Sequence, residues 1–170
     1  QKTPIAAALA AAFWPGPLTL ILQRNDDCPV AMLTTAGLDK VGVRVPVHRS
    51  AQTLLQAFGK PIAAPSANPS GRISPSTAKH VLDGLGGRLD LVLDGGSCES
   101  GLESTIIDCT GDAARLLRPG GITREALAAA LTAANCNPQI DIAEPLADHE
   151  NPAAPGQLAS HYAPKAPLRL

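Results

Sequence analysis

Two arginines stand in apolar runs where a charged residue is unusual. Arg44 lies among the alternating valines of "VGVRVP", and Arg118 ends the apolar part of "ARLLRP", just before two glycines. A guanidinium offers a planar fork of donors that matches a carboxylate or a phosphate, and a lysine lacks that geometry. Each arginine could therefore bind an anionic group, or it could be a strand residue that faces water.

Serine and asparagine side chains gather in "PIAAPSANPSGRISPSTAKHV", residues 61–81. An apolar run breaks into a turn with Ser66 and Asn68, and a helix restarts at Ser74. A strand, a polar loop and a helix N-terminus in this order can present hydroxyls and backbone N–H groups to a phosphate or a carboxylate. The Walker and GxGxxG spacings are absent, which excludes an ordinary P-loop or dinucleotide site. The same residues could also form a simple Asx or Ser turn with a helix cap.

The segment "GLESTIIDC" places Ser104, Ile106 and Asp108 on one face of a predicted strand. A serine at the start of this strand can hydrogen-bond a small ligand, or it can simply end the strand. His80 precedes an apolar helix position, and we expect it to be a solvated surface residue. No serine, histidine and acid have a hydrolase spacing and the GxSxG elbow is absent, so nothing here indicates a protein nucleophile.

These residues need a scaffold of alternating strands and helices. The apolar patterns predict strands at residues 18–22, 41–45, 61–64, 89–94, 104–109 and 114–118, and helices at 5–13, 50–58, 75–85 and 124–134. Thr3, Ser74 and Thr123 are the predicted N-caps, and Gly59 ends the second helix. Interleaved elements indicate an α/β fold, with a mixed sheet because the last two strands leave room only for a hairpin. Beyond residue 135 the chain is Pro-rich and acidic, and we expect a linker there.

Composition narrows the class of protein. A chain of 170 residues suits one domain, and 45% hydrophobic but only 2% aromatic residues predict an aliphatic core with little surface for stacking bases. The net charge of −1 provides no general attraction for a polyanion. Four cysteines without a CxxC pair argue against a zinc site. No apolar run reaches the roughly 20 residues of a membrane span, so we expect a cytoplasmic protein without membrane contact.

Six motifs in order resemble the threonylcarbamoyl-AMP synthase family, also called the YrdC or Sua-type family. They are "FWPGPLTLIL", "VGVRVP", "PIAAPSANPSGRISPSTAKHV", "LDGG", "GLESTIIDC" and "LLRPGGITRE". The resemblance implies an open, twisted, mixed α/β sheet with flanking helices in a synthase domain at residues 1–134. "APGQLASHYAPKAP" is similar to the linker of two-domain members, so residues 135–170 are interpreted as a linker or lid leading to a further domain. Relatives carry an N-terminal segment that does not precede Gln1, and we expect a partial domain.

The resemblance also implies a reaction. Family members make threonylcarbamoyl-adenylate from L-threonine, bicarbonate and ATP, with Mg²⁺ on the phosphates, and release pyrophosphate. The product serves tRNA modification through a downstream threonylcarbamoyl transferase complex. A carbamate oxygen on the threonine amine attacks the α-phosphorus, so catalysis rests on positioning and charge neutralisation and needs no catalytic side chain as a nucleophile. We expect the 170-residue chain alone to bind ATP weakly without turnover.

Site residues follow from the matching motifs. The threonine-binding set is Arg44, Ala64 through its backbone, and Ser104. The ATP-binding set is Lys40, Ser66, Asn68, Ser74, Arg118, His161 and Tyr162, the last two as parts of the lid. Two segments differ from the family pattern. Lys40 stands where relatives often carry threonine, and Ala159 and Ser160 stand where an aromatic residue is expected before His161.

Two other functions remain open from the sequence. A module that binds double-stranded RNA or tRNA without catalysis would use the basic concavity of the related fold, although the charge near zero argues against it. The carbamoyl-transfer module of hydrogenase maturation factors also resembles this chain. That module belongs to much longer proteins, and the "SHYAP" segment favours the synthase.

Overall fold

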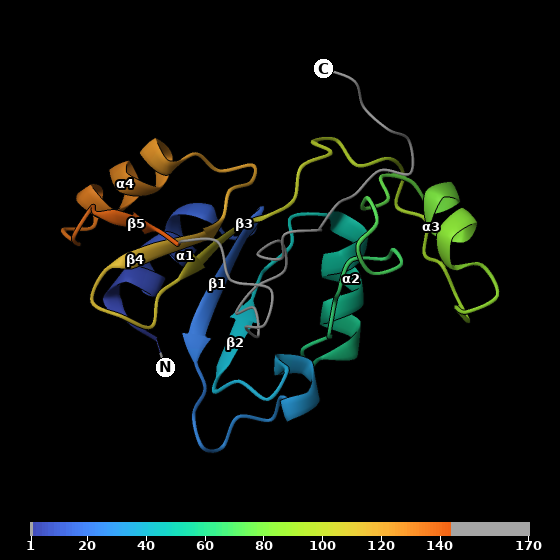
Figure 1. The fold of residues 1–170 in the computed structure, drawn as a ribbon, viewed down its shortest axis with the longest axis horizontal. Helices are drawn as coiled ribbons and strands as arrows, with labels where there is room; N and C mark the ends of the chain where they lie inside the picture. Colours follow the sequence, from blue (N-terminus) through green and yellow to red (C-terminus); the bar gives the residue numbers. More distant parts are fainter. Residues whose placement is uncertain (1, 144–170) are drawn as a thin grey trace.

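The computed structural model describes residues 2–143, which form a mixed sheet with flanking helices (Figure 1). The helices are α1 (Pro4–Phe13), α2 (Arg49–Phe58), α3 (Ala78–Leu85) and α4 (Arg124–Ala133), with a short 3₁₀ helix, η1 (Met32–Thr35). The strands are β1 (Leu18–Gln23), β2 (Lys40–Val43), β3 (Thr105–Asp108), β4 (Ala114–Arg118) and β5 (Ile140–Ile142). The predicted α/β class is confirmed.

The five strands lie in the order β2-β1-β3-β4-β5. β1 runs antiparallel to β2 and parallel to β3, whereas β3 and β4 form the predicted antiparallel hairpin and β5 lies parallel to β4. The parallel pairing of β1 and β3 brings residues 18–21 beside residues 105–108. Residues more than 80 positions apart in the sequence therefore share one end of the sheet.

One face of the sheet carries the hydrophobic core. Leu20 and Ile107 stand opposite each other on β1 and β3 and are buried against helices α1 and α4. Leu9 of α1 and Leu127 of α4 are fully buried in the same cluster. Burial of such a side chain contributes about 1.5–3 kcal/mol, so this aliphatic layer is the main source of stability.

Local signals position the helices that form this layer. The Thr3 hydroxyl accepts a hydrogen bond from the Ala6 N–H at 3.2 Å, and the Thr123 hydroxyl accepts one from Ala126 at the same distance. Both residues are N-caps, as predicted. Gly59 ends α2 with a left-handed φ of 67°, which glycine adopts without steric cost.

The opposite face of the sheet carries a smaller buried cluster and is polar at one end. Because alternate residues of a strand face opposite sides, Thr19 and Ile21 of β1 share this face with Ser104 and Ile106. Ile21 and Ile106 form a second, small buried cluster with Leu117. Past this cluster, toward residue 19, the side chains become polar.

Several predicted elements are wrong at their boundaries. The helix expected to begin at Ser74 and Pro75 begins at Ala78, because Thr77 is the N-cap and accepts the His80 N–H at 3.2 Å. The strand expected at residues 41–45 ends at Val43, so Arg44 lies just beyond it.

Three further predictions about regular structure are also wrong. Residues 61–64 and 89–94 contain apolar residues but are not strands, since neither segment joins a ladder with another described segment. The predicted linker is not irregular throughout, because residues 140–142 extend the sheet as β5 beside β4. The short "IDI" sequence forms a strand there because β4 offers it a free edge.

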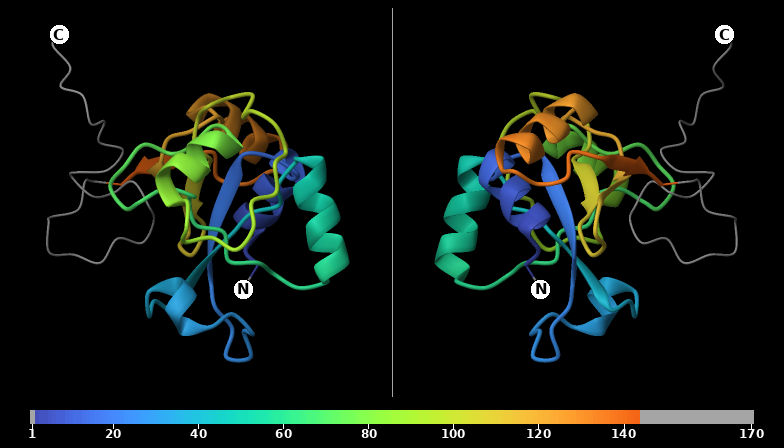
Figure 2. Two further views of the ribbon diagram at one scale, coloured as in Figure 1. Left: turned by 90° about the vertical axis from the view of Figure 1, so that its right-hand side faces the viewer. Right: turned by 90° about the vertical axis from the view of Figure 1, so that its left-hand side faces the viewer.

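Helices α2 and α3 lie to one side of the sheet with the long segments that connect them (Figures 1 and 2). Neither helix has a buried residue. Within residues 2–143, every helix is too short or too polar to cross a membrane.

Candidate functional site

Polar groups converge at the end of the sheet where β3 begins. The hydroxyls of Thr19 and Ser104 lie 2.8 Å apart. The Arg118 guanidinium donates to the Ser104 carbonyl from Nε at 3.1 Å and from Nη2 at 2.9 Å, and Nη2 also reaches the Ser104 hydroxyl at 3.0 Å. Ser104 is buried, so these bonds hold its hydroxyl in one place.

Arg44 lies at the same end, just after β2. Its Nε donates to the Gly16 carbonyl at 3.1 Å, and among residues 2–143 no hydrogen bond engages its terminal nitrogens. Partial burial lowers the pKa of Arg44, while the Glu103 carboxylate raises it and the Arg118 charge lowers it. A guanidinium stays protonated at neutral pH in spite of such shifts. Two permanent positive charges, Arg44 and Arg118, therefore lie close enough to interact with each other at this end of the sheet.

Glu103 links this sheet end to the polar loop at residues 66–74. One carboxylate oxygen accepts the Ser74 hydroxyl, and the other lies 3.6 Å from the Arg118 Nη2. The Asn68 side chain closes the loop on itself by donating to the Pro69 and Arg72 carbonyls at 3.0 and 3.1 Å. The sheet end and the loop thus form one connected polar surface.

A glycine allows this close approach of two chain segments. Gly120 lies directly against the start of β3, where a Cβ atom would stand 2.4 Å from the Glu103 carbonyl oxygen. No side chain fits in that space. The glycine after "LLRP" therefore brings Arg118 near Glu103 and Ser104.

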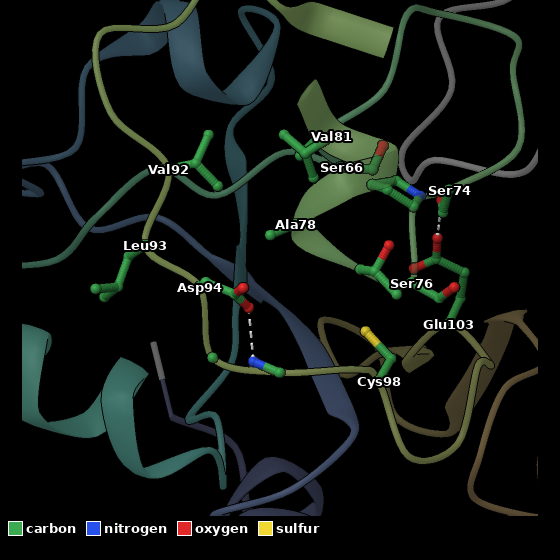
Figure 3. Close-up of a pocket in the computed structure, with 15 residues that line it drawn as sticks. Ser66, Ser74, Ser76, Ala78, Val81, Val92, Leu93, Asp94, Cys98 and Glu103 are labelled. Atoms are coloured by element: carbon green, nitrogen blue, oxygen red, sulfur yellow. Dashed lines mark hydrogen bonds between the residues drawn. The ribbon is translucent and has the colours of Figure 1, made fainter. Parts of the chain in front are cut away.

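A hollow of about 300 Å³ lies next to Glu103 (Figure 3). Its polar wall includes Ser66, Ser74, Ser76, Thr77 and Glu103, and its apolar wall includes Ala67, Pro75, Ala78, Val81, Val92 and Leu93. The N-terminus of α3 opens onto it, where backbone N–H groups and the helix dipole favour an anion. This volume is at the small end of the range for ligand pockets.

Residues 94–96 form another part of this wall. The Asp94 Oδ1 accepts the Gly96 N–H at 2.9 Å, and Gly96 has a φ of 90°. The Cys98 N–H donates to the Ser76 carbonyl at 2.8 Å, which ties this side of the hollow to the segment before α3. In the part of the chain that the structure describes, no group of three or more His, Cys, Asp or Glu could hold a metal ion.

The structure brings most of the predicted site residues together. Arg44, Ser104 and Arg118 meet at the sheet end, and Ser66 and Ser74 line the hollow, with Asn68 in the loop between them. Ala64 is exposed in the segment that leads into that loop. His161 and Tyr162 lie outside the described residues.

Lys40 is placed apart from the other predicted residues. It lies at the other end of β2 from Arg44, about 13 Å away along an extended chain. Its Nζ forms an ion pair with the Asp108 carboxylate at 2.9 Å. Burial raises the pKa of Asp108, but hydrogen bonds from Thr110 and Lys40 and the Lys40 charge outweigh it, so the net pKa lies below its ordinary value. This placement does not support a contact of Lys40 with ATP.

The buried thiol of Cys109 is not available as a nucleophile. Burial, with a smaller effect of the Asp108 carboxylate, raises the pKa of the Cys109 thiol to about 12, so this thiol stays protonated. None of the four cysteines forms a disulfide. His80 is exposed, as predicted, and its ring Nδ1 lies 3.2 Å from the Ser76 hydroxyl.

Sequence reasoning missed two members of the site. Thr19 could have been noticed, because it is the one polar residue inside the apolar run "PLTLIL" and alternation puts it on the face opposite to Leu18 and Leu20. Glu103 directly precedes Ser104, but no local pattern indicates that it accepts the hydroxyl of Ser74.

The sequence comparisons agree with this arrangement. Residues 1–120 match the Sua5, YciO and YrdC family model, which is described as "Telomere recombination". The chain belongs to the Sua5/YciO/YrdC family. Residues 122–170 of this Sua5/YrdC chain match a second model, described as "Threonylcarbamoyl-AMP synthase, C-terminal domain". The predicted division between residues 134 and 135 stays a prediction.

Two curated relatives carry the same name. The threonylcarbamoyl-AMP synthase of Bacillus subtilis is 45% identical over 166 residues, which cover 97% of this Sua5/YrdC chain and 46% of the relative. The synthase of Pyrococcus abyssi is 41% identical over 166 residues, with 95% and 46% covered. The chain thus spans about half the length of these relatives.

Solved structures show the same fold. P. abyssi Sua5 in complex with L-threonine superposes with a TM-score of 0.87 at 40% identity, covering 98% of this chain and 47% of that one. Escherichia coli YciO superposes with a TM-score of 0.61 at 28% identity, covering 72% and 59%. These similarities confirm the sequence-based family assignment and the mixed-sheet fold.

Proposed function

We propose that this chain forms the catalytic part of an L-threonylcarbamoyladenylate synthase, which converts L-threonine, bicarbonate and ATP into threonylcarbamoyl-AMP and pyrophosphate. The observation that carries the proposal is the joining of two subsites. Arg118 hydrogen-bonds to Ser104, and Arg44 lies close enough to interact with the charges of Arg118 and Glu103. Glu103 in turn lines the hollow to which Ser66 also belongs. An amino acid and a nucleotide would thus be adjacent.

The sheet end is the proposed amino-acid subsite. Arg44 would bind the threonine carboxylate through its terminal nitrogens, since a guanidinium matches a carboxylate in two parallel hydrogen bonds. Ser104, already oriented by Arg118 and Thr19, would contribute its hydroxyl. Ala64 would offer backbone groups from the neighbouring segment. The relative crystallised with L-threonine supports an amino acid as the ligand.

The hollow is the proposed ATP subsite. Its apolar wall suits a base, while Ser66, Ser74 and the α3 N-terminus suit the sugar and phosphates. Arg118 would reach the phosphates from the sheet end, and Asn68 would hold the loop in shape through its two carbonyl partners. Lys40 is left out of this subsite because of its distant ion pair with Asp108.

The proposed reaction depends on the positioning of the substrates and needs no side chain as a nucleophile. Bicarbonate and the threonine amine would form a carbamate with loss of water. A carbamate oxygen would then attack the α-phosphorus; a new P–O bond forms, the bond between the α-phosphorus and the oxygen that bridges to the β-phosphate breaks, and pyrophosphate leaves. Arg44 and Arg118 would hold the two reactants together and neutralise developing charge. Mg²⁺, when bound, would supply further charge neutralisation. Asp94 is the carboxylate of the hollow that would contribute a ligand, because both oxygens of Glu103 are paired with Ser74 and Arg118.

Other parts of the proposal rest on the family. We infer a cytoplasmic location, and transfer of the product to tRNA through a downstream transferase complex. The part of the predicted linker that follows β5 would serve as a linker and lid that carries His161 and Tyr162. One solved P. abyssi Sua5 is a variant in which a histidine and the next residue, a tyrosine, are replaced by alanine.

Thermal shift with threonine, ATP and both together tests the two subsites. Arg44→Ala should abolish the shift caused by threonine and keep the shift caused by ATP, and Ser66→Ala should do the reverse. Ser70→Ala is the matched control, since this exposed serine of the same loop should leave both shifts unchanged.

Two results would contradict the proposal. One is a wild-type chain whose melting temperature responds to neither ligand. The other is tight binding of duplex RNA with a steep salt dependence and no response to threonine and ATP, which would favour the RNA-binding module. Rapid release of pyrophosphate by the 170-residue chain would disprove only the expectation that this chain alone is inactive.

A further inference from the structure

His48 makes a contact that the proposed chemistry does not use. It is the N-cap residue of α2, and its side chain does not cap the helix. Instead, its ring Nε2 lies 3.1 Å from the Gly95 carbonyl oxygen. A carbonyl only accepts, so the ring nitrogen donates, which both the Nε2–H neutral tautomer and the imidazolium can do.

Gly95 leaves room for this ring because it has no side chain. A Cβ atom at position 95 would lie 2.6 Å from the His48 Cε1 and 3.0 Å from its Nε2. The imidazole therefore packs directly against the glycine, and any side chain at this position would displace it. A hydrogen bond and a steric fit thus act between the same two residues.

The contact holds a part of the nucleotide hollow. Gly95 lies between Asp94 and Gly96, and all three line the hollow (Figure 3). We name residues 94–96 the wall segment. This segment joins no strand ladder with another described segment. Two residues beyond this segment, the Cys98 N–H donates to the Ser76 carbonyl, which precedes α3. On the other side, His48 at the start of α2 contacts Gly95.

We propose that His48 is a positioning residue that sets the wall segment for ATP binding. The inference rests on the proposed function, since it takes the hollow as the ATP subsite. His48 follows Arg44 by four residues, so a single stretch of chain supplies both the threonine carboxylate contact and the support for the nucleotide wall. Loss of the ring releases residues 94–96 and weakens ATP binding, while threonine binding at the sheet end stays the same.

The test is a double-mutant cycle on ATP affinity, with threonine affinity and melting temperature measured alongside. His48→Ala and Gly95→Ala should each weaken ATP binding by about tenfold, the value of one lost hydrogen bond with its packing. The double variant should bind ATP no more weakly than either single variant, because both changes remove the same contact. The ATP Kd should change, but the threonine Kd should stay within about twofold.

Gly96→Ala is the matched control. It strains the backbone at a φ of 90° rather than touching His48, so its effect should add to that of His48→Ala. Three outcomes would overturn the inference: ATP binding by His48→Ala within twofold of wild type, additive effects of His48→Ala and Gly95→Ala, or an equal loss of threonine binding. A wild-type protein that binds threonine but no ATP would instead overturn the ATP subsite of the proposed function.

Discussion

Two parts of the molecule differ sharply in how they are packed. The packed part, residues 5–21 with 104–140, contains every buried residue of the described chain, whereas the open part, residues 44–103, contains none. Thr19, Ser104 and Arg118 at the sheet end stand on the packed part, whereas Arg44 is the first residue of the open part. The residues that line the hollow all belong to the open part.

This contrast suggests how the two subsites work. A side chain on a packed strand keeps one position, so Thr19 and Ser104 of the amino-acid subsite are in place before a ligand arrives. Segments with few buried contacts open at a lower free energy than the core. We therefore expect the nucleotide subsite to gain order on binding, and changes in the two parts to affect different measurements.

The largest expected effect is on stability. Leu127→Ala should lower the free energy of unfolding by about 3 kcal/mol, because this fully buried leucine of α4 belongs to the core that α4 shares with the sheet and α1. Leu54→Ala in the open part should cost less than about 1 kcal/mol, since that leucine is 48% exposed. Urea denaturation measures both. Equal costs would mean that the open part has a core of its own.

A buried hydrogen bond in the packed part should have the next largest effect. The Thr105 hydroxyl donates to the Ile122 carbonyl and accepts its N–H, both at 3.0 Å. Thr105→Val keeps the shape but leaves both backbone groups unpaired, at a cost of about 2 kcal/mol. Thr53→Val on the exposed face of α2 is the control and should change stability by less than about 0.5 kcal/mol. A small cost at position 105 would argue that water replaces the hydroxyl.

Hydrogen exchange can test whether the open part gains order. The amides of α3 should exchange faster than those of α4 without ligand. ATP at about ten times its Kd should slow α3 roughly tenfold, because exchange then requires release of the ligand. Threonine alone is the control and should not slow α3. Uniform slowing of α3 and α4 by ATP would contradict a separate response of the open part.

The smallest expected effect concerns pH. Since the pKa of Asp108 is lowered in the folded protein, its carboxylate stabilises the fold above the ordinary pKa of 3.8, and this contribution is lost as the pH falls through the folded pKa. Asp108→Asn should therefore cost about 1 kcal/mol at pH 7 and progressively less below pH 4.

A matched surface pair provides the control for the pH experiment. Asp83 pairs with Lys79 on α3, where both side chains are mostly exposed. Asp83→Asn should leave stability unchanged at both pH values, because exposed pairs contribute little. If Asp108→Asn cost as much at pH 3 as at pH 7, the loss would come from packing rather than from the charge.

Much of the fold could be predicted because the signals are local. Thr3 and Thr123 cap their helices through N–H groups three residues away, and the hairpin of β3 and β4 is closed by a short turn. The apolar runs at 61–64 and 89–94 were predicted as strands for the same local reasons. A strand also needs a partner ladder, which a single run of residues cannot specify.

The candidate site was predicted only in part. The motifs indicated Arg44, Ser104, Arg118 and the serines of the loop, and the structure brings them together. Ser74 was predicted as a helix cap, because a serine before a proline is typical of a helix start. Its hydroxyl instead donates to Glu103, a residue 29 positions away in the sequence, and Thr77 caps the helix in its place.

By itself, the sequence determined which residues alternate across strands, where α1 and α4 begin, and which side chains could bind an anion. The tertiary structure alone decided their partners: Thr19 lies 85 positions from Ser104, Lys40 lies 68 from Asp108, and His48 lies 47 from Gly95. Backbone preferences act within a few residues, whereas a hydrogen bond depends on two groups meeting within about 3 Å. Strand order and the approach of α2 to the wall segment bring such groups together.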